Sequence, residues 1–381
     1  MKKICYVTTL AVTLRTFVLK SAIQLHDTGD FDITFIANPN EEVEKSFPEY
    51  IHFIPVKMTR GIGFDGLRVI GELRKIFKRE KFDLVQYSTP NASCYASIAS
   101  WLEKIPVRLY AQWGMVYVGF SGLKRKIFKT IEKTVCKLST WVEPDSAGNL
   151  EFSHQEGLYP VNKGSVVWNG SAIGISLEKF DISKKELYRN SIREKYNIPQ
   201  AAYVYGFVGR LNRDKGANEL LTASKKIIDE HNEVFLMIVG TDKEFGTVDA
   251  ELINWAKGHD RVIFTGYTTT TEQYYAAMDC YILPSYREGF GMTVIEAESM
   301  ELPVIVTNIP GPTNGMIDKE TGIVVKKKDA EELESTMRFL LTSPSLGIDY
   351  GKKGRKFVTE HFEQNMLLKK IEEDRRKLLS I

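Results

Sequence analysis

The feature that most limits the fold of this chain is an alternation of short apolar runs with longer amphipathic stretches. In the first half, strand-like runs read KKICYVTT, FDITFIAN, FDLVQYST and PVRLYAQWG. In the second half, they read YVYGFVG, VFLMIVG, RVIFTG, CYILPS and PVIVTN. Stretches with helical spacing, such as FDGLRVIGELRKIFKRE and ELLTASKKIIDEH, lie between them. This βαβα order predicts parallel sheets with helices on both faces.

A polar, irregular stretch at 176–200 interrupts the alternation and predicts a linker between two domains. The chain has 381 residues, which is about right for two domains and too many for one ordinary domain. We therefore expect an α/β protein of two Rossmann-like, doubly wound domains, at 1–175 and 201–355. A C-terminal helix over 356–381 is expected to pack back on the first domain. Ligands of such sheets bind beyond the carboxyl ends of the strands, so a central cleft between the domains is the expected site.

Several features favour the cytoplasm. The four cysteines form no CxxC pair, which argues against a disulfide framework or a zinc site. No run of about 18 apolar residues predicts a membrane-spanning helix. The start, MKKICYVTTLAVTLRTF, is interrupted by threonines and by Arg15, so it predicts a buried strand followed by a loop, TTLAVTLRT, and not a signal peptide.

The segment GFVGRLNRDKG, at 206–216, joins the end of a strand to the start of a helix. Glycine lets backbone approach a ligand, and a helix N-terminus offers free N–H groups. Arg210 supplies a planar fork and Lys215 a point charge, so the segment is a candidate diphosphate site. It does not fit a Walker A loop. Taken alone, the cations can equally be solvated surface residues.

A second segment, REGFGMTVIEAE at 287–298, places two glutamates eight residues apart around two glycines. Glu288 stands at the entrance of a predicted helix and Glu296 about one turn inside it. The first carboxylate can accept hydrogen bonds from sugar hydroxyls, and the second can bind a vicinal diol such as a ribose. The alternative is an acidic first turn that only complements the helix dipole.

The two segments together resemble those of retaining glycosyltransferases of family 4, which have the two-domain GT-B fold. GRLNRDKG matches that family's G-R-L-x-x-x-K-G, and EGFGMTVIE, at 288–296, matches its Glu-x7-Glu signature. The resemblance is strong over about 200–330 and looser over 1–175. It implies an N-terminal acceptor-binding domain and a C-terminal donor-binding domain, as in bacterial capsular, exopolysaccharide and O-antigen glycosyltransferases.

The resemblance also implies roles for single residues. Arg210 and Lys215 would bind the diphosphate of a nucleotide sugar, and Glu288 would hold the donor sugar, these three being the catalytic candidates. Glu296 would bind the ribose. The full set of donor-binding candidates is Gly209, Arg210, Lys215, Gly266, Tyr267, Glu288, Gly289, Phe290, Gly291, Thr293 and Glu296.

No metal site and no cofactor is expected beside the nucleotide-sugar co-substrate. Negative charge that grows on the leaving diphosphate would meet Arg210, Lys215 and a helix N-terminus, in place of a metal ion. The one DxD motif, at 30–32, precedes a predicted strand far from the donor segments and is read as an ordinary turn. The family resemblance implies a retaining reaction, with the acceptor attacking on the leaving-group face.

The first domain departs from the family pattern. The loop TTLAVTLRT contains no glycine, and no histidine follows the strand PVRLYAQWG. The residues available on the acceptor side are instead Thr9, Gln112 and Trp113, which become the candidates there.

Basic amphipathic stretches lie in the N-terminal part of the chain. Residues 1–185 hold 25 Lys and Arg against 19 Asp and Glu, and the remainder holds 26 against 30. The stretch 121–141 has six basic residues and one acidic residue, and 57–81 has eight and three. Such helices can lie on an anionic membrane, although their apolar faces can equally pack on their own domain. No nucleic-acid-binding motif is evident.

The sequence thus predicts a retaining glycosyltransferase that moves a hexosyl or N-acetylhexosaminyl group from a nucleotide sugar, with a UDP-sugar favoured. The acceptor is expected to be a lipid-linked saccharide in surface polysaccharide biosynthesis, at the inner face of the plasma membrane. Two alternatives remain: a nucleotide-sugar epimerase on the same fold, and an inactive, membrane-attached subunit that binds nucleotide sugar.

Overall fold

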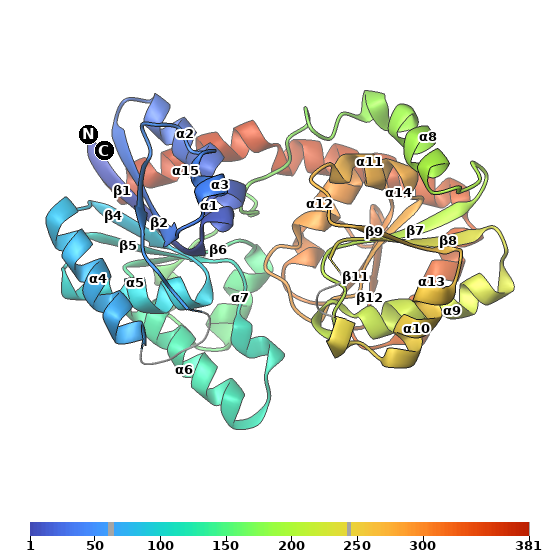
Figure 1. Ribbon diagram of the computed structural model, residues 1–381, viewed down its shortest axis with the longest axis horizontal. Coiled ribbons are helices and arrows are strands. Elements are labelled where there is room, and N and C mark those ends of the chain that lie inside the picture. The colour runs from blue at the N-terminus through green and yellow to red at the C-terminus, as the bar shows by residue number, and fades with distance from the viewer. Residues whose placement is uncertain (60–64, 242–244, 381) are drawn as a thin grey trace. The chain divides into compact units, whose positions relative to one another are not determined.

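The computed structural model describes residues 1–59, 65–241 and 245–380, which form two compact units (Figure 1). Unit 1 comprises Met1–Gly174 and the C-terminal segment from Gln364, and unit 2 comprises Ile175–Glu363. Each unit is a Rossmann-like parallel sheet with alternating helices, as the sequence predicts. The chain passes between the units at Gly174 and again at Glu363.

In unit 1, the described residues form a sheet in the order β3-β2-β1-β4-β5-β6. Its strands are β1 Lys2–Leu10, β2 Phe31–Asn38, β3 His52–Pro55, β4 Leu84–Tyr87, β5 Val107–Gln112 and β6 Trp141–Pro144. Its α-helices are α1 Ala11–Phe17, α2 Leu19–Asp27, α3 Glu41–Glu44, α4 Asp65–Glu80, α5 Pro90–Leu102, α6 Gly122–Leu138, α7 Ala147–Gln155 and α15 Gln364–Leu378. Short 3-10 helices are η1 Val116–Gly119 and η2 Val161–Lys163.

Two predictions for unit 1 are corrected. The segment after β1 is not a loop, because α1 begins at Ala11, directly after the strand. Ala11 and Leu14 on this helix are buried, so burial of two apolar side chains one turn apart favours a helix. The strands β3 and β6 were not predicted. Each is four residues long, ends in a proline and is only partly buried, so it shows no continuous apolar run.

In unit 2, the part of the chain that the structure describes forms a sheet in the order β12-β11-β10-β7-β8-β9. Its strands are β7 Tyr203–Val208, β8 Val234–Val239, β9 Val262–Gly266, β10 Cys280–Leu283, β11 Val304–Thr307 and β12 Gly322–Val325. Its α-helices are α8 Lys185–Lys195, α9 Ala217–Glu230, α10 Ala250–Gly258, α11 Thr271–Ala277, α12 Met292–Ser299, α13 Ala330–Leu341 and α14 Pro344–Phe362. The 3-10 helices are η3 Ile182–Lys184, η4 Arg213–Lys215, η5 Phe245–Thr247 and η6 Pro312–Asn314.

The stretch 176–200, predicted as a linker, folds as part of unit 2. Phe180 and Ile192 are buried in the hydrophobic core of that unit. Arg193 is fully buried, and its guanidinium binds Asp279 at 2.7 Å and also donates to backbone carbonyls. A buried charge needs such partners, so this polar-looking stretch is held firmly to the unit.

The C-terminal region is also different from the prediction of one helix over 356–381. α14 ends at Phe362, and Glu363 has an extended backbone (φ −59°, ψ 131°) that interrupts the helix. α15 then packs in unit 1, where Arg375 is 2% exposed and Leu367 is buried. In Figure 1 this helix lies along the sheet of unit 1 beside α2.

Candidate active site

The strand order of unit 2 places its switch point between β7 and β10. From β7 the chain builds β8 and β9 on one side, and it then returns to β10 on the other side of β7. These strands are parallel, so the loops that follow β7 and β10 leave the same edge of the sheet. The loops are 209–216 and 284–291, and they carry the two sequence motifs. Ligands of open α/β sheets bind at such a point.

Glycines let the backbones of neighbouring loops touch at this edge. A Cβ on Gly216 would lie 2.0 Å from the carbonyl oxygen of Pro284. A Cβ on Gly240, which follows β8, would lie 1.9 Å from the carbonyl oxygen of Gly209. Gly216 (φ 71°) and Gly240 (φ 149°) also have backbone conformations that residues with a side chain rarely adopt. Space and conformation therefore both require glycine here.

Polar contacts tie the same two loops together. The backbone N–H of Tyr286 donates to the carbonyl of Asp214 at 2.8 Å. The guanidinium of Arg287 donates to the carboxylate of Asp214 at 2.6 Å and 3.0 Å. The hydroxyl of Tyr286 donates to the carboxylate of Glu219, on α9, with its two oxygens at 2.6 Å and 2.7 Å. The loops thus form one connected platform.

An ion pair between the two motifs lies at the centre of this platform. Nζ of Lys215 lies 2.5 Å from Oε1 of Glu288, and the side chains are 23% and 11% exposed. The hydroxyl of Ser285 donates to the same carboxylate oxygen at 2.7 Å. Ser285 is itself fixed, because its carbonyl accepts a hydrogen bond from the hydroxyl of Thr307 at the end of β11. A cation and a carboxylate are therefore held ready in fixed positions.

The backbone between the glutamates is shaped by close packing. A Cβ on Gly311 would lie 1.8 Å from the carbonyl oxygen of Gly289, so these backbones are in contact. Gly291 is the N-cap of α12 in a left-handed conformation (φ 82°). The ring of Phe290 is 2% exposed and packs edge-to-face on Phe362 with centroids 5.2 Å apart. The ring thus belongs to the core, which leaves only the Phe290 backbone for a ligand.

Glu296 lies within α12 and has a different environment from Glu288. The hydroxyl of Tyr275 donates to its Oε2 at 3.0 Å. Burial is the main cause that raises the pKa of Glu296 to about 7; the hydrogen bond from Tyr275 and the charge of Lys179 oppose this rise, and the neighbouring Glu272 adds to it. The carboxyl group is therefore close to half ionised at neutral pH.

The other predicted donor residues lie in or beside these loops. Arg210 is exposed just after β7. The carbonyl of Thr293, in the first turn of α12, accepts a hydrogen bond from the Tyr275 hydroxyl at 3.3 Å. Gly266 ends β9 with a left-handed backbone (φ 76°), and the next residue, Tyr267, is 76% exposed. A tyrosine this exposed offers a free aromatic face at the same edge of the sheet.

The three acceptor-side candidates in unit 1, Thr9, Gln112 and Trp113, have different structural environments. Thr9 lies near the end of β1, at the switch point between β1 and β4. Its hydroxyl lies 2.9 Å from that of Thr89, and its N–H donates to the same Thr89 oxygen at 3.0 Å. Thr89 has a left-handed backbone (φ 70°). The pair thus fixes the first turns that follow these two strands.

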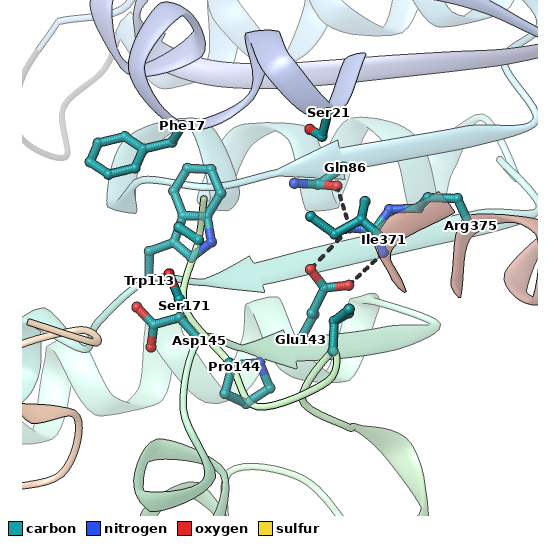
Figure 2. Close-up of a pocket in the computed structure, with 13 residues that line it drawn as sticks. Phe17, Ser21, Gln86, Trp113, Glu143, Pro144, Asp145, Ser171, Ile371 and Arg375 are labelled. Atoms are coloured by element: carbon teal, nitrogen blue, oxygen red, sulfur yellow. Dashed lines mark hydrogen bonds and ion pairs between the residues drawn. The ribbon is translucent and has the colours of Figure 1, made fainter. Parts of the chain in front are cut away.

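Gln112 and Trp113 are adjacent in sequence but differ in their surroundings. Gln112 is fully buried; its amide donates to Glu132 at 2.6 Å and accepts from Ser153 at 2.9 Å. This hydrogen bonding uses both ends of the amide inside the unit. Trp113, in contrast, lines a pocket at the carboxyl ends of β5 and β6 (Figure 2).

Several site residues were not found from the sequence. Ser285, which orients Glu288, and Tyr275, which binds Glu296, belong to no recognised motif. Tyr275 lies in α11, and only the folded chain brings it to α12. The Arg287–Asp214 pair joins residues 73 apart in the sequence. Of these residues, only Ser285 could have been suspected from the sequence, because it stands three residues before Glu288 in the same loop.

Among the described residues, no group of three or more His, Cys, Asp or Glu side chains is arranged to hold a metal ion. Within 1–59, 65–241 and 245–380, no helix is long and apolar enough to cross a membrane.

Comparison with known families covers both halves of the chain. Residues 188–357 match the family model "Glycosyl transferases group 1". Residues 3–143 match the family model "Glycosyl transferase 4-like". The two matches thus fall on unit 2 and unit 1 respectively, with the platform of 209–216 and 284–291 inside the first.

Individual relatives agree with these matches. The chain is 27% identical to the capsular polysaccharide biosynthesis glycosyltransferase CapM of Staphylococcus aureus, over 93% of this chain and 92% of CapM. It is 27% identical to the UDP-Gal:alpha-D-GlcNAc-diphosphoundecaprenol alpha-1,3-galactosyltransferase of Escherichia coli, over 81% of this chain and 79% of that one. Sucrose-phosphate synthase from Thermosynechococcus elongatus has a similar fold, with a TM-score of 0.79, 18% identity and all of both chains covered. With a glycosyltransferase 4-like region in unit 1 and a group 1 region in unit 2, this chain is a glycosyltransferase with the GT-B fold.

Proposed function

We propose that this enzyme moves a sugar, with retention of anomeric configuration, from a UDP-sugar to a lipid-linked saccharide during surface polysaccharide biosynthesis. The proposed binding of the nucleotide-sugar donor rests on the Lys215–Glu288 ion pair, which lies on glycine-lined loops at the switch point of unit 2. The choice of UDP and of a lipid-linked acceptor is supported by the Escherichia coli relative, whose name states both. The capsular role of CapM supports the pathway.

Each part of the donor has a partner in this proposal. Arg210 and Lys215, with the backbone at Gly209, bind the diphosphate by charge and by close approach. Glu288 and the backbone N–H groups of 289–291 hold the donor sugar. Glu296 accepts hydrogen bonds from the ribose, and Thr293 lies beside it in α12. Gly266 and Tyr267 border the base, where the exposed ring offers a stacking surface.

The chemistry follows from where charge develops. As the glycosidic bond breaks, positive charge grows at the anomeric carbon and negative charge grows on the departing diphosphate. Cations that already occupy fixed positions stabilise that charge without reorganisation. We infer that Lys215 and Arg210 do this without a metal ion. The acceptor hydroxyl then attacks from the side of the leaving group, where proximity and not an enzyme nucleophile is decisive.

We further propose that α6 holds the enzyme at the inner face of the plasma membrane. Leu123 is 73% exposed and Ile127 is 50% exposed on this helix, beside exposed lysines. Nζ of Lys124 lies 4.0 Å from the centroid of the Phe120 ring. Exposed apolar residues flanked by cations fit an anionic lipid surface. The second predicted basic stretch, 57–81, lies partly outside the described residues.

The membrane proposal is tested by sedimentation with vesicles that contain phosphatidylglycerol. Binding should fall in a Leu123→Ser, Ile127→Ser double variant and should weaken with added salt. The control is Leu187→Ser, because Leu187 is 66% exposed on α8 of unit 2. If the double variant sedimented as the wild type does, α6 would not be the contact.

The enzymatic proposal is tested by nucleotide binding and donor hydrolysis. UDP should raise the melting temperature, since a ligand that binds only the folded state stabilises it; GDP, ADP and TDP are the comparison set. Glu288→Ala should abolish hydrolysis of the donor while its melting temperature stays near that of the wild type. Glu320→Ala, at an exposed position of the same unit, is the matched control. Full activity of Glu288→Ala would show that the site is elsewhere.

A further inference from the structure

Two neighbouring ion pairs join the loops that follow β7 and β10 in unit 2. Asp214 and Lys215 are consecutive in the first loop, and Arg287 and Glu288 are consecutive in the second. Lys215 pairs with Glu288, and Arg287 pairs with Asp214, so each loop supplies one cation and one carboxylate. Only the Lys215–Glu288 pair has a role in the proposed function, which leaves the second pair to be explained.

The Arg287–Asp214 pair is fixed by directed hydrogen bonds as well as by charge. Nε and Nη2 of Arg287 both donate to Oδ2 of Asp214, at 3.0 Å and 2.6 Å. The backbone N–H of the preceding residue, Tyr286, donates to the carbonyl of Asp214 at 2.8 Å. The loop after β10 therefore holds Asp214 by its side chain and by its backbone. A planar peptide bond joins Asp214 to Lys215, so the position of one constrains the other.

The backbone of Lys215 is also fixed from within its own loop. Its N–H donates to the side chain of Asn212 at 3.1 Å, and Asn212 is itself buried. On the other side of Lys215, the backbone of Gly216 is in contact with the carbonyl of Pro284. Asp214 is thus the position at which a charged side chain of the other loop secures this turn.

The Lys215–Glu288 pair has to change when a donor binds. In the proposed function, the ammonium group of Lys215 binds the diphosphate and the carboxylate of Glu288 binds the donor sugar. The attraction that joins the loops through these two side chains is then shared with the ligand. The Arg287–Asp214 pair undergoes no such exchange, because neither member is assigned to the donor. It can keep the loops together while the first pair takes up its ligand.

The exposure of the second pair separates an effect on position from an effect on stability. The side chains of Arg287 and Asp214 are 35% and 44% exposed, which is more than those of Lys215 and Glu288. An ion pair as exposed as this contributes little to the free energy of unfolding. In contrast, displacement of a catalytic group by about 1 Å can cost about 10²-fold in rate. Loss of the pair should therefore affect turnover much more than the melting temperature.

We propose that Arg287 is a positioning residue for glycosyl transfer: through Asp214, it holds the ammonium group of Lys215 at the place where the leaving diphosphate gains charge. This role rests on the proposed function, which assigns the diphosphate to Lys215. Arg287 does not itself bind the donor, because Asp214 already neutralises its charge.

The first test removes the pair from either side, by Asp214→Asn or by Arg287→Met. Each change should lower kcat roughly 10–100-fold and change KM less, because the charge that Lys215 meets develops in the transition state. Arg287→Lys should recover part of kcat, since it restores the charge without the planar fork. The substrate is whichever of UDP-glucose, UDP-galactose and UDP-N-acetylglucosamine the wild type hydrolyses fastest. Melting temperatures should stay within about 3 °C of the wild type.

The matched control is Glu230→Gln, at the other end of α9 from the loop that carries Asp214. Glu230 pairs with Arg338 at 2.7 Å, and this pair is also partly exposed and belongs to unit 2. Its loss should leave kcat as it is in the wild type. If Glu230→Gln lowered kcat as much as Asp214→Asn does, the effect would come from the stability of the unit and the positioning role would be overturned.

The second test asks whether Arg287 acts through Lys215. In a Lys215→Ala background, Arg287→Met should lower kcat by less than about twofold, because the group that it positions is already absent. An equal loss in both backgrounds would overturn the proposal. So would a higher KM in Arg287→Met together with an unchanged kcat in Asp214→Asn, because that result would mean that Arg287 binds the donor directly.

Lys215→Ala alone distinguishes failure of this role from failure of the proposed function. If Lys215→Ala lowers kcat but Asp214→Asn and Arg287→Met do not, the positioning role is wrong and the proposed function stands. If Lys215→Ala remains as active as the exposed-site variant Lys352→Ala, the proposed function loses its diphosphate ligand. The positioning role is then overturned as well, since Arg287 would have no catalytic group to position.

Discussion

Nζ of Lys215 lies 2.5 Å from Oε1 of Glu288, although 73 residues separate the two in the sequence. The pair joins the loop after β7 to the loop after β10, and Ser285 donates to the same carboxylate oxygen. Each charge is therefore neutralised before any ligand arrives. Binding of a diphosphate would have to draw the ammonium group of Lys215 away from Glu288 or share it between two anions. The carboxylate would then be more available to a sugar hydroxyl.

The first prediction concerns Lys215→Ala. Removal of a preorganised cation from the leaving diphosphate should lower kcat by roughly 10²–10³-fold, as loss of one such electrostatic contact does elsewhere. Lys215→Arg should recover part of this loss, because the charge returns with a different geometry. Steady-state donor turnover measures both. Lys352→Ala, at an exposed position of α14, is the control, and a Lys215→Ala enzyme as active as this control would exclude a role for Lys215.

The second prediction concerns the glycines that bring the loops together. Gly216→Ala should destabilise the protein by about 2 kcal/mol or more, because it combines a left-handed backbone with a Cβ placed 2.0 Å from the Pro284 carbonyl. Gly71→Ala should instead stabilise the protein. Gly71 is inside α4, a Cβ there meets no described atom within 4 Å, and alanine favours helix by about 0.5–1 kcal/mol. Chemical denaturation of the two variants measures this difference, and equal effects would contradict the packing argument.

The sequence was sufficient for the parts of the site that are local. The alternation of apolar runs with amphipathic stretches predicted both parallel sheets. The two motifs placed Lys215 and Glu288 on loops, and the fold brings these loops into contact. The strands β3, β6 and β12, which are only partly buried, were missed, whereas β4, β10 and β11, which are equally short but fully buried, were predicted.

What the sequence could not show depends on packing between distant segments. Gln112 was a candidate because it stands in the region where the family pattern has a histidine, yet the fold buries it against Glu132 and Ser153. The partner of Glu296, Tyr275, lies on another helix, and the raised pKa of Glu296 results from burial that no local pattern reveals. Burial and partners of single polar groups are properties of the folded chain.

The third prediction is a pH dependence of donor binding. Burial raises the pKa of Glu296 to about 7, so its carboxylate is the main form above pH 7 and the neutral acid below it. If the ionised form accepts the ribose hydroxyl hydrogens, the KM for donor should rise as the pH falls from 8 to 6. The intact UDP-sugar is the correct ligand, because the terminal phosphate of free UDP itself titrates in this range. Glu296→Gln should have a higher KM that does not vary over this range; a variant that retained the wild-type pH profile would assign the titration to another group.

The fourth prediction concerns Glu298, a carboxyl group outside the proposed chemistry. It is 0% exposed, and its carboxyl oxygens have no hydrogen bond of ordinary geometry among the described residues, although the side chain of Thr321 lies close enough to lower its pKa. Burial raises the pKa of Glu298 well above its ordinary value, so folding favours the neutral form of this group. In the unfolded chain it ionises near its ordinary pKa. The folded state therefore loses stability as the pH rises above that value, until the folded pKa is reached.

Glu298→Gln removes this titration at nearly constant volume. The variant should be more stable than the wild type at pH 8, with a difference in melting temperature that shrinks toward about pH 3.5, roughly one unit below the ordinary glutamate pKa, where the wild-type group is largely neutral in both states. Melting curves across this range measure the effect. Glu331→Gln, at an exposed position in the first turn of α13, should show no such growing difference. A Glu298→Gln protein whose stability followed the wild type at every pH would mean that the glutamate is ionised in the folded state and has acquired a partner there.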